Sequence, residues 1–150
     1  MTSVTVSLTK EIRRPIDVVR AQYGDIRHHQ ANNVHPDFEF TVHSSDEQRS
    51  EYTQVSRVLG FRRSDEVQLD LRADGSRHAK FVEGPSQGLE IFASFESLGP
   101  DSTLVEFKVV APLRGLMALA KPLVKRQLTR DIANVLEEDR IDLEELGYPR

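Results

Sequence analysis

The apolar residues follow two different periods along the chain. At the start, Val4, Val6 and Leu8 alternate with threonine and serine, which is typical of a strand with one buried face. The same alternation returns between residues 37 and 112, in short runs separated by clusters of glycine, proline, serine and aspartate. The pattern therefore predicts a first strand over residues 3–11 and a later meander of about six antiparallel strands. The six runs are residues 38–42, 52–59, 66–71, 77–82, 89–95 and 104–110.

Two short helices are expected between the first strand and the meander. Pro15 suits the first turn of a helix, where its missing N–H costs no hydrogen bond, and Gly24 suits the end of that helix. Asp25 can cap the second helix, because its carboxylate accepts a hydrogen bond from backbone N–H groups that lack a partner within the helix. The His35-Pro36 pair ends it, since the residue before a proline disfavours the helical conformation.

The end of the chain is predicted to be one long helix preceded by a short one. Beyond Pro112, leucine, isoleucine, methionine and valine recur at spacings of three, four and five residues, which favours helices with an apolar face. Pro122 predicts a kink or a restart between the two helices, and Gly147 predicts the end of the long one.

The composition fits one folded domain over residues 1–150. A chain of 150 residues with 38% hydrophobic and 29% charged residues can bury a core of its own. Its net charge is −4 and its basic residues are spread from end to end, so we expect no nucleic-acid partner. Cysteine is absent, which leaves histidine and carboxylate side chains as ligands for any metal.

Signals for membranes and for targeting are weak. No apolar run approaches the length that spans a bilayer, and the N-terminal residues lack the apolar core of a signal peptide. We therefore expect a cytoplasmic protein, and the sequence leaves its oligomeric state open. Residues 114–130 alternate basic residues with leucine and methionine, a pattern that suits a membrane surface, a partner or simply a solvated face.

The order of the elements resembles a known group of folds. One strand, two short helices, six antiparallel strands and a long C-terminal helix are the order of the START, ring-hydroxylase and polyketide-cyclase superfamily, whose architecture is called the helix grip. The segment Glu11-Ile-Arg-Arg-Pro-Ile-Asp-Val-Val19 is similar to the usual join of strand and helix in that group. The resemblance covers residues 4–146. It implies an α+β domain in which a curved antiparallel sheet of about seven strands wraps around the long helix and leaves a cavity between them.

The segment Asp25-Ile-Arg-His-His-Gln-Ala-Asn-Asn-Val-His-Pro36 holds three of the five histidines. Its opening, from Asp25 to His28, resembles the start of the iron-binding segment in ring-hydroxylase catalytic domains. In those domains a second histidine follows and an aspartate comes from the C-terminal helix, which here implies His35 and Asp139. Two histidines and one carboxylate are a ligand set that suits Fe or Zn.

The other histidines are not assigned to this site. His29 is expected to lie outside it, since neighbouring residues of a helix point about 100° apart. His43 and His78 lie among charged residues of the predicted strands and are expected to face solvent. An alternative for the whole segment is a helix end, or the polar mouth of a pocket, that holds no metal.

The resemblance also implies which residues line the cavity. Small-molecule sites are usually apolar pockets with a few polar groups. The expected lining residues are His28, His35, Phe38, Phe40, Tyr52, Phe92, Phe95, Phe107 and Met117.

Three functions stay open on the sequence. The first is the binding of a small hydrophobic molecule in the cavity, with cyclase or lyase activity as an extension. The second is a metal-binding protein with His28, His35 and Asp139 as ligands. The third is a protein-interaction module in which the cavity is vestigial.

Overall fold

The computed structural model describes residues 2–58 and 61–150. Seven strands form one antiparallel sheet, in which the first strand pairs with the last and the other six follow one another as a meander. They are β1 (Ser3–Ile12), β2 (Phe38–Ser45), β3 (Arg49–Val58), β4 (Phe61–Leu71), β5 (Arg77–Glu83), β6 (Glu90–Gly99) and β7 (Ser102–Pro112). The order across the sheet is β1-β7-β6-β5-β4-β3-β2.

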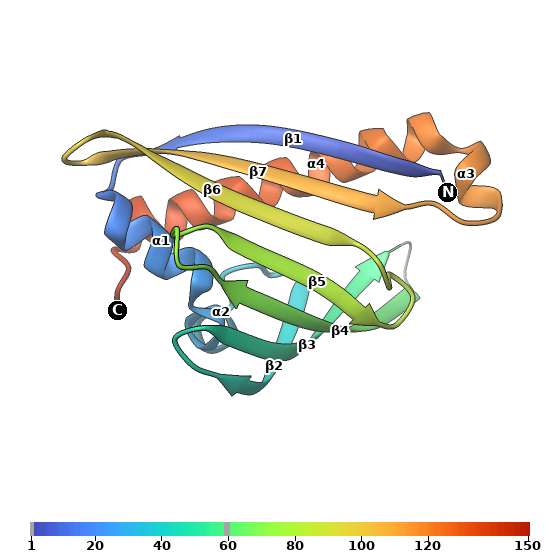
Figure 1. Ribbon diagram of the computed structural model, residues 1–150, viewed down its shortest axis with the longest axis horizontal. Coiled ribbons are helices and arrows are strands. Elements are labelled where there is room, and N and C mark those ends of the chain that lie inside the picture. Colours follow the sequence, from blue (N-terminus) through green and yellow to red (C-terminus); the bar gives the residue numbers. More distant parts are fainter. Residues whose placement is uncertain (1, 59–60) are drawn as a thin grey trace.

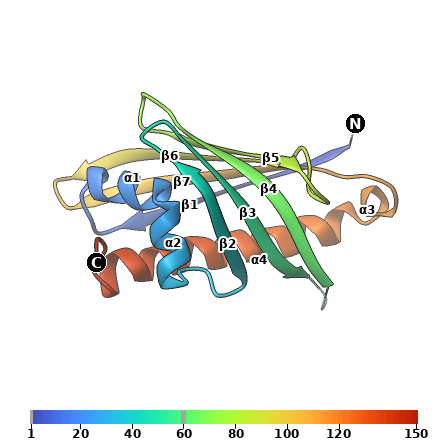
Figure 2. The ribbon, with the colours of Figure 1, turned by 90° about the horizontal axis from the view of Figure 1, so that it is seen from below.

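The helices lie at the ends and across one face of this sheet. They are α1 (Ile16–Gly24), α2 (Ile26–Asn32), α3 (Leu116–Leu119), α4 (Lys121–Arg140) and a final π-helical turn, η1 (Ile141–Glu145). The sheet curves around α4, and α1 and α2 lie near the C-terminal end of that helix (Figures 1 and 2). The predicted α+β helix-grip fold is therefore confirmed, with seven strands and two short helices after the first strand.

Several element boundaries differ from those predicted. β4 begins well before the predicted start, at Phe61, because the polar residues 62–65 obscure the alternation although they pair with β3. Ser44 and Ser45, which were expected in a turn, extend β2. The predicted end of the third strand at Leu59 lies outside the described residues.

Pro122 restarts the helix and does not kink it. α3 ends at Leu119, and α4 begins at Lys121 with the proline in its first turn, where no backbone hydrogen bond is lost. At the other end, η1 carries the chain to Glu145, and Gly147 follows with a φ of 75°. Glycine adopts this left-handed conformation without steric cost, so the predicted stop is confirmed.

The described residues form three buried apolar clusters, of which the two larger ones fill most of the space between the sheet and the helices. The first lies between α4 and the half of the sheet formed by β1, β6 and β7, where Val105 and Leu136 are almost inaccessible to solvent. The second lies on β3, β4 and β5 and includes Tyr52 and Phe81, with Ile26 of α2 against it. α4 packs along β1, which is an edge strand of the sheet. A space therefore remains between the cluster beneath this helix and the cluster on β3, β4 and β5. Within the described residues, no helix is long and apolar enough to cross a membrane.

Candidate functional site

A cavity of about 330 Å³ lies between the two larger apolar clusters. Ala79 and Ala93 of the sheet and Ile132 of α4 contribute to its apolar wall. Arg57 and Asp131 also line it but are exposed to solvent, so the opening lies between the end of β3 and the middle of α4. The volume is at the lower end of the range for small-molecule sites.

The structure brings five of the nine expected lining residues into the wall of this cavity. They are His35, Phe38, Phe40, Tyr52 and Phe107. The four that lie elsewhere are His28, Phe92, Phe95 and Met117.

Phe92 lies on the opposite face of the sheet. Its neighbours Ile91 and Ala93 point into the cavity, and successive side chains of a strand point to opposite faces. Phe92 stacks instead on His78 of β5, with the ring centroids 4.3 Å apart. The expectation that His78 faces solvent is therefore wrong, because this stacking leaves the residue only 5% exposed.

Phe95 and Met117 are displaced for different reasons. Tyr23 of α1 packs edge-on against Phe95, with the ring centroids 5.4 Å apart, and itself lines the cavity. Met117 lies on α3, at the far end of the molecule from α1, where it is 47% exposed (Figure 1).

The histidine segment is shaped by two capping residues. The Asp25 carboxylate accepts a hydrogen bond from the backbone N–H of His28 at 3.1 Å, so it caps α2 as predicted. Asn33 follows the helix with φ 49° and ψ 47°, a left-handed conformation that asparagine tolerates better than most residues. The helix therefore ends sharply, and His35 lies buried beside it, facing α4.

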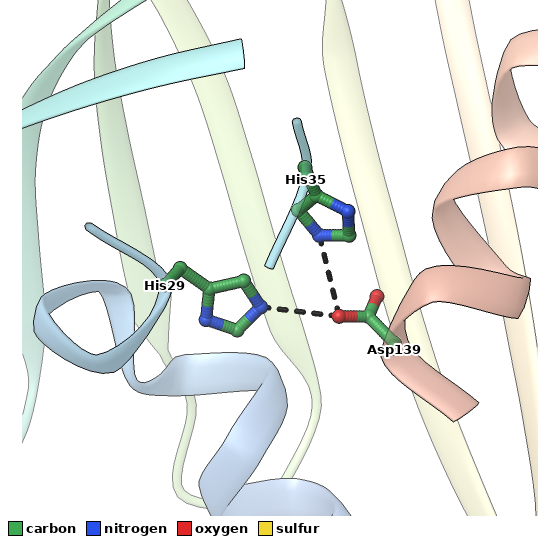
Figure 3. A group of neighbouring side chains, drawn as sticks. All are labelled: His29, His35 and Asp139. Carbon is green, nitrogen blue, oxygen red and sulfur yellow. Dashed lines mark hydrogen bonds and ion pairs between the residues drawn. The ribbon is translucent and has the colours of Figure 1, made fainter. Parts of the chain in front are cut away.

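His29, His35 and Asp139 converge on one point between α2 and α4 (Figure 3). The Nε2 atoms of the two histidines lie 3.1 and 3.2 Å from the same oxygen of Asp139, Oδ1. All three residues are buried, and one potential ligand atom from each lies within 4.8 Å of the other two.

Each imidazole is oriented by a second acceptor. Nδ1 of His29 lies 2.8 Å from the carbonyl oxygen of Asp25, and Nδ1 of His35 lies 2.9 Å from Oε1 of Glu138. A carbonyl oxygen only accepts hydrogen bonds, so Nδ1 of His29 donates to it. In this way both rings turn Nε2 toward Asp139.

The charges of this group stabilise one another in a buried setting. Burial lowers the pKa of His35, but Asp139 and Glu138 outweigh it and raise that pKa to about 10. Burial raises the pKa of Asp139, but His35 and His29 outweigh it and hold that pKa well below the usual range. Near neutral pH, His35 and Asp139 are therefore an ion pair in the metal-free protein.

His28 belongs to a different pair and not to this group. Its Nε2 lies 2.8 Å from Oδ2 of Asp142, whose other oxygen accepts a hydrogen bond from Arg150 at 2.7 Å. The two histidines do point in different directions, as the helical geometry requires. That geometry, however, turns His29 toward Asp139 and His28 away from it, the reverse of our expectation.

Two residues of α1 complete the site and were missed in the sequence. The amide nitrogen of Gln22 donates to both Asp139 and Asp142, at 2.9 and 3.1 Å. Within the described part of the chain, the buried hydroxyl of Tyr23 has no hydrogen-bond partner. Burial and, after it, Asp139 raise the pKa of Tyr23 well above its usual value, so the hydroxyl stays protonated. Tyr23 therefore offers a free donor at the cavity wall.

Comparisons with known proteins identify solved structures that have a similar fold. No family model and no curated protein sequence matches the chain. A structure from Thermus thermophilus is similar with a TM-score of 0.84 and 14% identity, over 96% of this chain and 99% of that one. A START superfamily protein from Mycobacterium smegmatis gives a TM-score of 0.78 and 16% identity, over 95% and 99%.

The Zhui aromatase/cyclase from a Streptomyces species gives a TM-score of 0.76 and 15% identity, over 97% of this chain and 99% of that one. Identities this low are informative about the fold and not about the chemistry. The chain therefore has the START-like helix-grip fold.

Proposed function

We propose that this protein binds a small, mostly hydrophobic molecule that carries one oxygen-bearing group. The observation that carries the proposal is the unpartnered hydroxyl of Tyr23 in the wall of the cavity. An unpaired buried polar group costs about 1–3 kcal/mol, and a ligand oxygen that accepts its hydrogen bond would remove that cost. The START-like fold of the chain supports the same function.

One group of polar side chains lies at the end of the cavity near α1 and α2, and other polar residues, such as Gln54, Arg57 and Asp131, line further parts of the wall beside apolar ones. Tyr23, His29, His35 and Asp139 line the part of the cavity near α1 and α2. Tyr23 offers a free hydroxyl donor, whereas both N–H groups of the charged His35 already meet Glu138 and Asp139. A donor beside a positive charge favours a carbonyl, enol or phenol oxygen as the partner of Tyr23. We infer that the ligand is a ring or short chain with such an oxygen at one end.

Turnover of the cyclase or lyase type is the further step of this proposal. Tyr23 would donate a hydrogen bond to a carbonyl oxygen of the ligand, and the positive charge of His35 would stabilise the negative charge that develops there, which makes the adjacent carbon more acidic. The Asp139 carboxylate, which lines the cavity, would then take the proton from that carbon as a general base. The likeness to a protein named as an aromatase/cyclase supports this step only through the shared fold.

The test is a fluorescence titration with 2-naphthol. Ala93 is 3% exposed and lines the cavity, so Ala93→Trp fills part of the cavity. Ala133 is exposed on α4, so Ala133→Trp is a matched control that adds the same side chain outside. We expect saturable binding in the wild type and in Ala133→Trp, and at least tenfold weaker binding in Ala93→Trp.

A second cavity variant controls for the possibility that Ala93→Trp does not fold. Overpacking a core costs about 1–3 kcal/mol, and Ala79→Leu adds less volume to the same wall than Ala93→Trp. Both variants are checked by circular dichroism. Equal affinity in wild type and in the folded cavity variants, or no binding in the wild type, would contradict the proposal.

A metal ion bound by His29, His35 and Asp139 is a second candidate ligand of this site. Zn–N and Zn–O bonds of about 2.0–2.2 Å place neighbouring ligand atoms about 3.0–3.5 Å apart. The separations of 3.1 and 3.2 Å from His29 and His35 to Asp139 fit that requirement. Hydrogen bonds from Nδ1 of each histidine to a carbonyl or carboxylate are also the usual outer contacts of metal ligands.

His29, His35 and Asp139 would hold such an ion. Bound there, Fe or Zn would supply a Lewis acid for the ligand oxygen. We therefore propose His29 in place of His28 as the second histidine of the ligand set. All three side chains also line the cavity, so a small molecule bound there would be able to reach such an ion.

Elemental analysis tests this candidate. The protein is incubated with Zn(II), or with Fe(II) without oxygen, and then desalted. We expect near-stoichiometric metal in the wild type and in His28→Ala, and loss of metal in His29→Ala and His35→Ala. Metal lost from His28→Ala but kept by folded His29→Ala would contradict this ligand set, and no metal in any of the proteins would remove the candidate.

A further inference from the structure

The helical end of the molecule that lies farthest from the histidines exposes large apolar side chains. Leu116, Leu119 and Leu123 are 83%, 83% and 68% exposed. Met117 beside them is 47% exposed. We call these four residues the leucine face. Monomeric soluble proteins rarely expose neighbouring apolar residues to this extent, and such surfaces usually bind something.

The leucine face is not needed for the core. The same helices use other residues, Ala118, Val124 and Leu128, to pack on the buried cluster formed by Val4, Ala111 and Leu113. The segment is therefore held to the sheet from its inner side. Its outer side stays apolar without a contribution to folding, which indicates a role in binding.

Basic residues surround the leucine face. Residues 113–130 contain five lysine or arginine residues and no acidic one, although the whole chain has a net charge of −4. The five are Arg114, Lys121, Lys125, Arg126 and Arg130, and all are exposed. The partner of this surface must therefore combine negative charge with an apolar interior.

α3 and the first turns of α4 form one end of the molecule (Figures 1 and 2). They lie at the opposite end from α1 and the C-terminus, beside the start of β1 and the end of β7 (Figures 1 and 2). A helix with leucine on one side and lysine or arginine around it has the composition of helices that lie in a membrane interface.

Other occupants fit this surface less well. In a symmetric dimer the same patch meets itself, so the basic residues of one copy would face those of the other. Contact surfaces for proteins are enriched in aromatic residues, methionine and arginine and depleted of lysine. Residues 113–130 contain three arginines and one methionine, but also two lysines and no aromatic residue. We propose that the leucine face and its basic residues dock on a membrane surface rich in anionic lipids.

Docking through the leucine face would bring the membrane surface close to the cavity. Leu123 belongs to the leucine face, and Leu128 on the same helix lines the cavity. A hydrophobic ligand dissolved in the membrane would then have a short path to the opening beside α4. This consequence rests on the proposed ligand binding, whereas the docking itself does not.

Flotation with lipid vesicles tests the docking. The vesicles consist of phosphatidylcholine alone or of phosphatidylcholine with phosphatidylglycerol. We expect the wild type to float with the anionic vesicles only, and added salt to weaken this binding. The charge variant is Lys121→Glu with Lys125→Glu, and its matched control is Arg13→Glu with Arg27→Glu, which reverses two exposed charges elsewhere.

The expected losses follow from the interactions removed. Each basic residue near an anionic surface contributes about fivefold to binding, so reversal of Lys121 and Lys125 should weaken binding by roughly 30-fold or more. Leu119→Ser with Leu123→Ser should weaken it by at least about tenfold. The control Leu98→Ser with Leu146→Ser, at residues 49% and 53% exposed, should bind as the wild type does.

The possible results distinguish membrane docking from association with a second copy of the chain. No flotation of the wild type, or equal flotation with both kinds of vesicle, would overturn the proposal. Flotation that the leucine and lysine variants leave unchanged would also overturn it. Self-association in analytical ultracentrifugation that Leu119→Ser with Leu123→Ser abolishes, together with no flotation, would assign the face to a second copy. The naphthol titration uses no lipid, so it can fail or succeed independently.

Discussion

Replacement of Asp139 by asparagine isolates the charge of the buried carboxylate from its shape. Asp139 is 2% exposed, and its Oδ1 meets the side chains of Gln22, His29 and His35. Asparagine keeps an acceptor for Gln22 but removes the buried negative charge that lies 3.2 Å from Nε2 of the His35 imidazolium. Removal of one partner from a buried ion pair typically costs about 3–5 kcal/mol.

The pKa of His35 gives a second measure of this cost. A pKa raised from 6.5 to about 10 corresponds to roughly 5 kcal/mol of preference for the charged form. Glu138 supplies part of that preference, so we expect Asp139→Asn to lower the free energy of unfolding by about 3 kcal/mol. Glu138→Gln is the matched control, and with a side chain 25% exposed it should cost only about 1 kcal/mol.

The penalty should depend on pH with a defined sign. The pKa of His35 is higher in the folded state than in the unfolded state, so its stabilising contribution is complete below pH 6.5 and lost as the pH rises toward 10. The pKa of Asp139 is lower in the folded state, so its contribution is present above pH 3.8 and lost in acid. The effect of Asp139→Asn is therefore largest between about pH 4 and 6.5.

Urea unfolding followed by circular dichroism, with a chelator present, measures both quantities. The account predicts a penalty at pH 6 that shrinks steadily toward pH 10. A variant as stable as the wild type at pH 6, or a penalty that grows with pH, would refute the ion pair of His35 and Asp139.

Three further substitutions test separate parts of the structure. Tyr23→Phe should weaken 2-naphthol binding by about fivefold and leave naphthalene binding unchanged in the same titration, and an equal loss for both compounds would exclude the hydroxyl as the contact. Asn33→Val should lower the free energy of unfolding by about 1–2 kcal/mol, because a β-branched residue resists the left-handed conformation that ends α2, and urea unfolding without any change would contradict that reason. Leu136→Ala should lower the free energy of unfolding by about 2–5 kcal/mol in the same assay, since Leu136 lies on the buried face of α4 and is 2% exposed. A loss below about 1 kcal/mol would show that the core around Leu136 is loosely packed.

The fold was predictable because its signals are local. Alternation in β1 and the later strands, Pro15, the cap at Asp25 and the restart at Pro122 each act within a few residues. These signals set the type and order of the elements, and element order sets the architecture. Boundaries were less predictable where polar residues extend a strand, as in β4, because their pairing depends on the neighbouring strand.

The site was predictable in its residue types but not in its pairing. The histidine segment and Asp139 were identified, yet the choice between His28 and His29 depends on how α2 is rotated about its axis. That rotation is fixed by contacts distant in sequence, such as His28 with Asp142 and Gln22 with Asp139. The periodicity of apolar residues gives no information about such long-range contacts.

Two other differences have the same origin. Phe92 could have been assigned to the outer face by its alternation with Ile91 and Ala93, but aromatic character alone suggested the cavity. Tyr23 lies on the apolar face of a short helix, where nothing in the sequence distinguishes a lining residue from a core residue. Its free hydroxyl is visible only once its surroundings are known.

The most direct test of ligand binding is a map of methyl chemical shifts by NMR during a titration with 2-naphthol. The methyl groups of Ala79, Ala93 and Ile132 line the cavity, whereas those of Ala21 and Ala133 are exposed on helices. The account predicts saturable shifts in the first three and none in the last two. Shifts confined to the exposed methyl groups, or no saturable shift at all, would contradict the claim that the cavity holds a hydrophobic ligand.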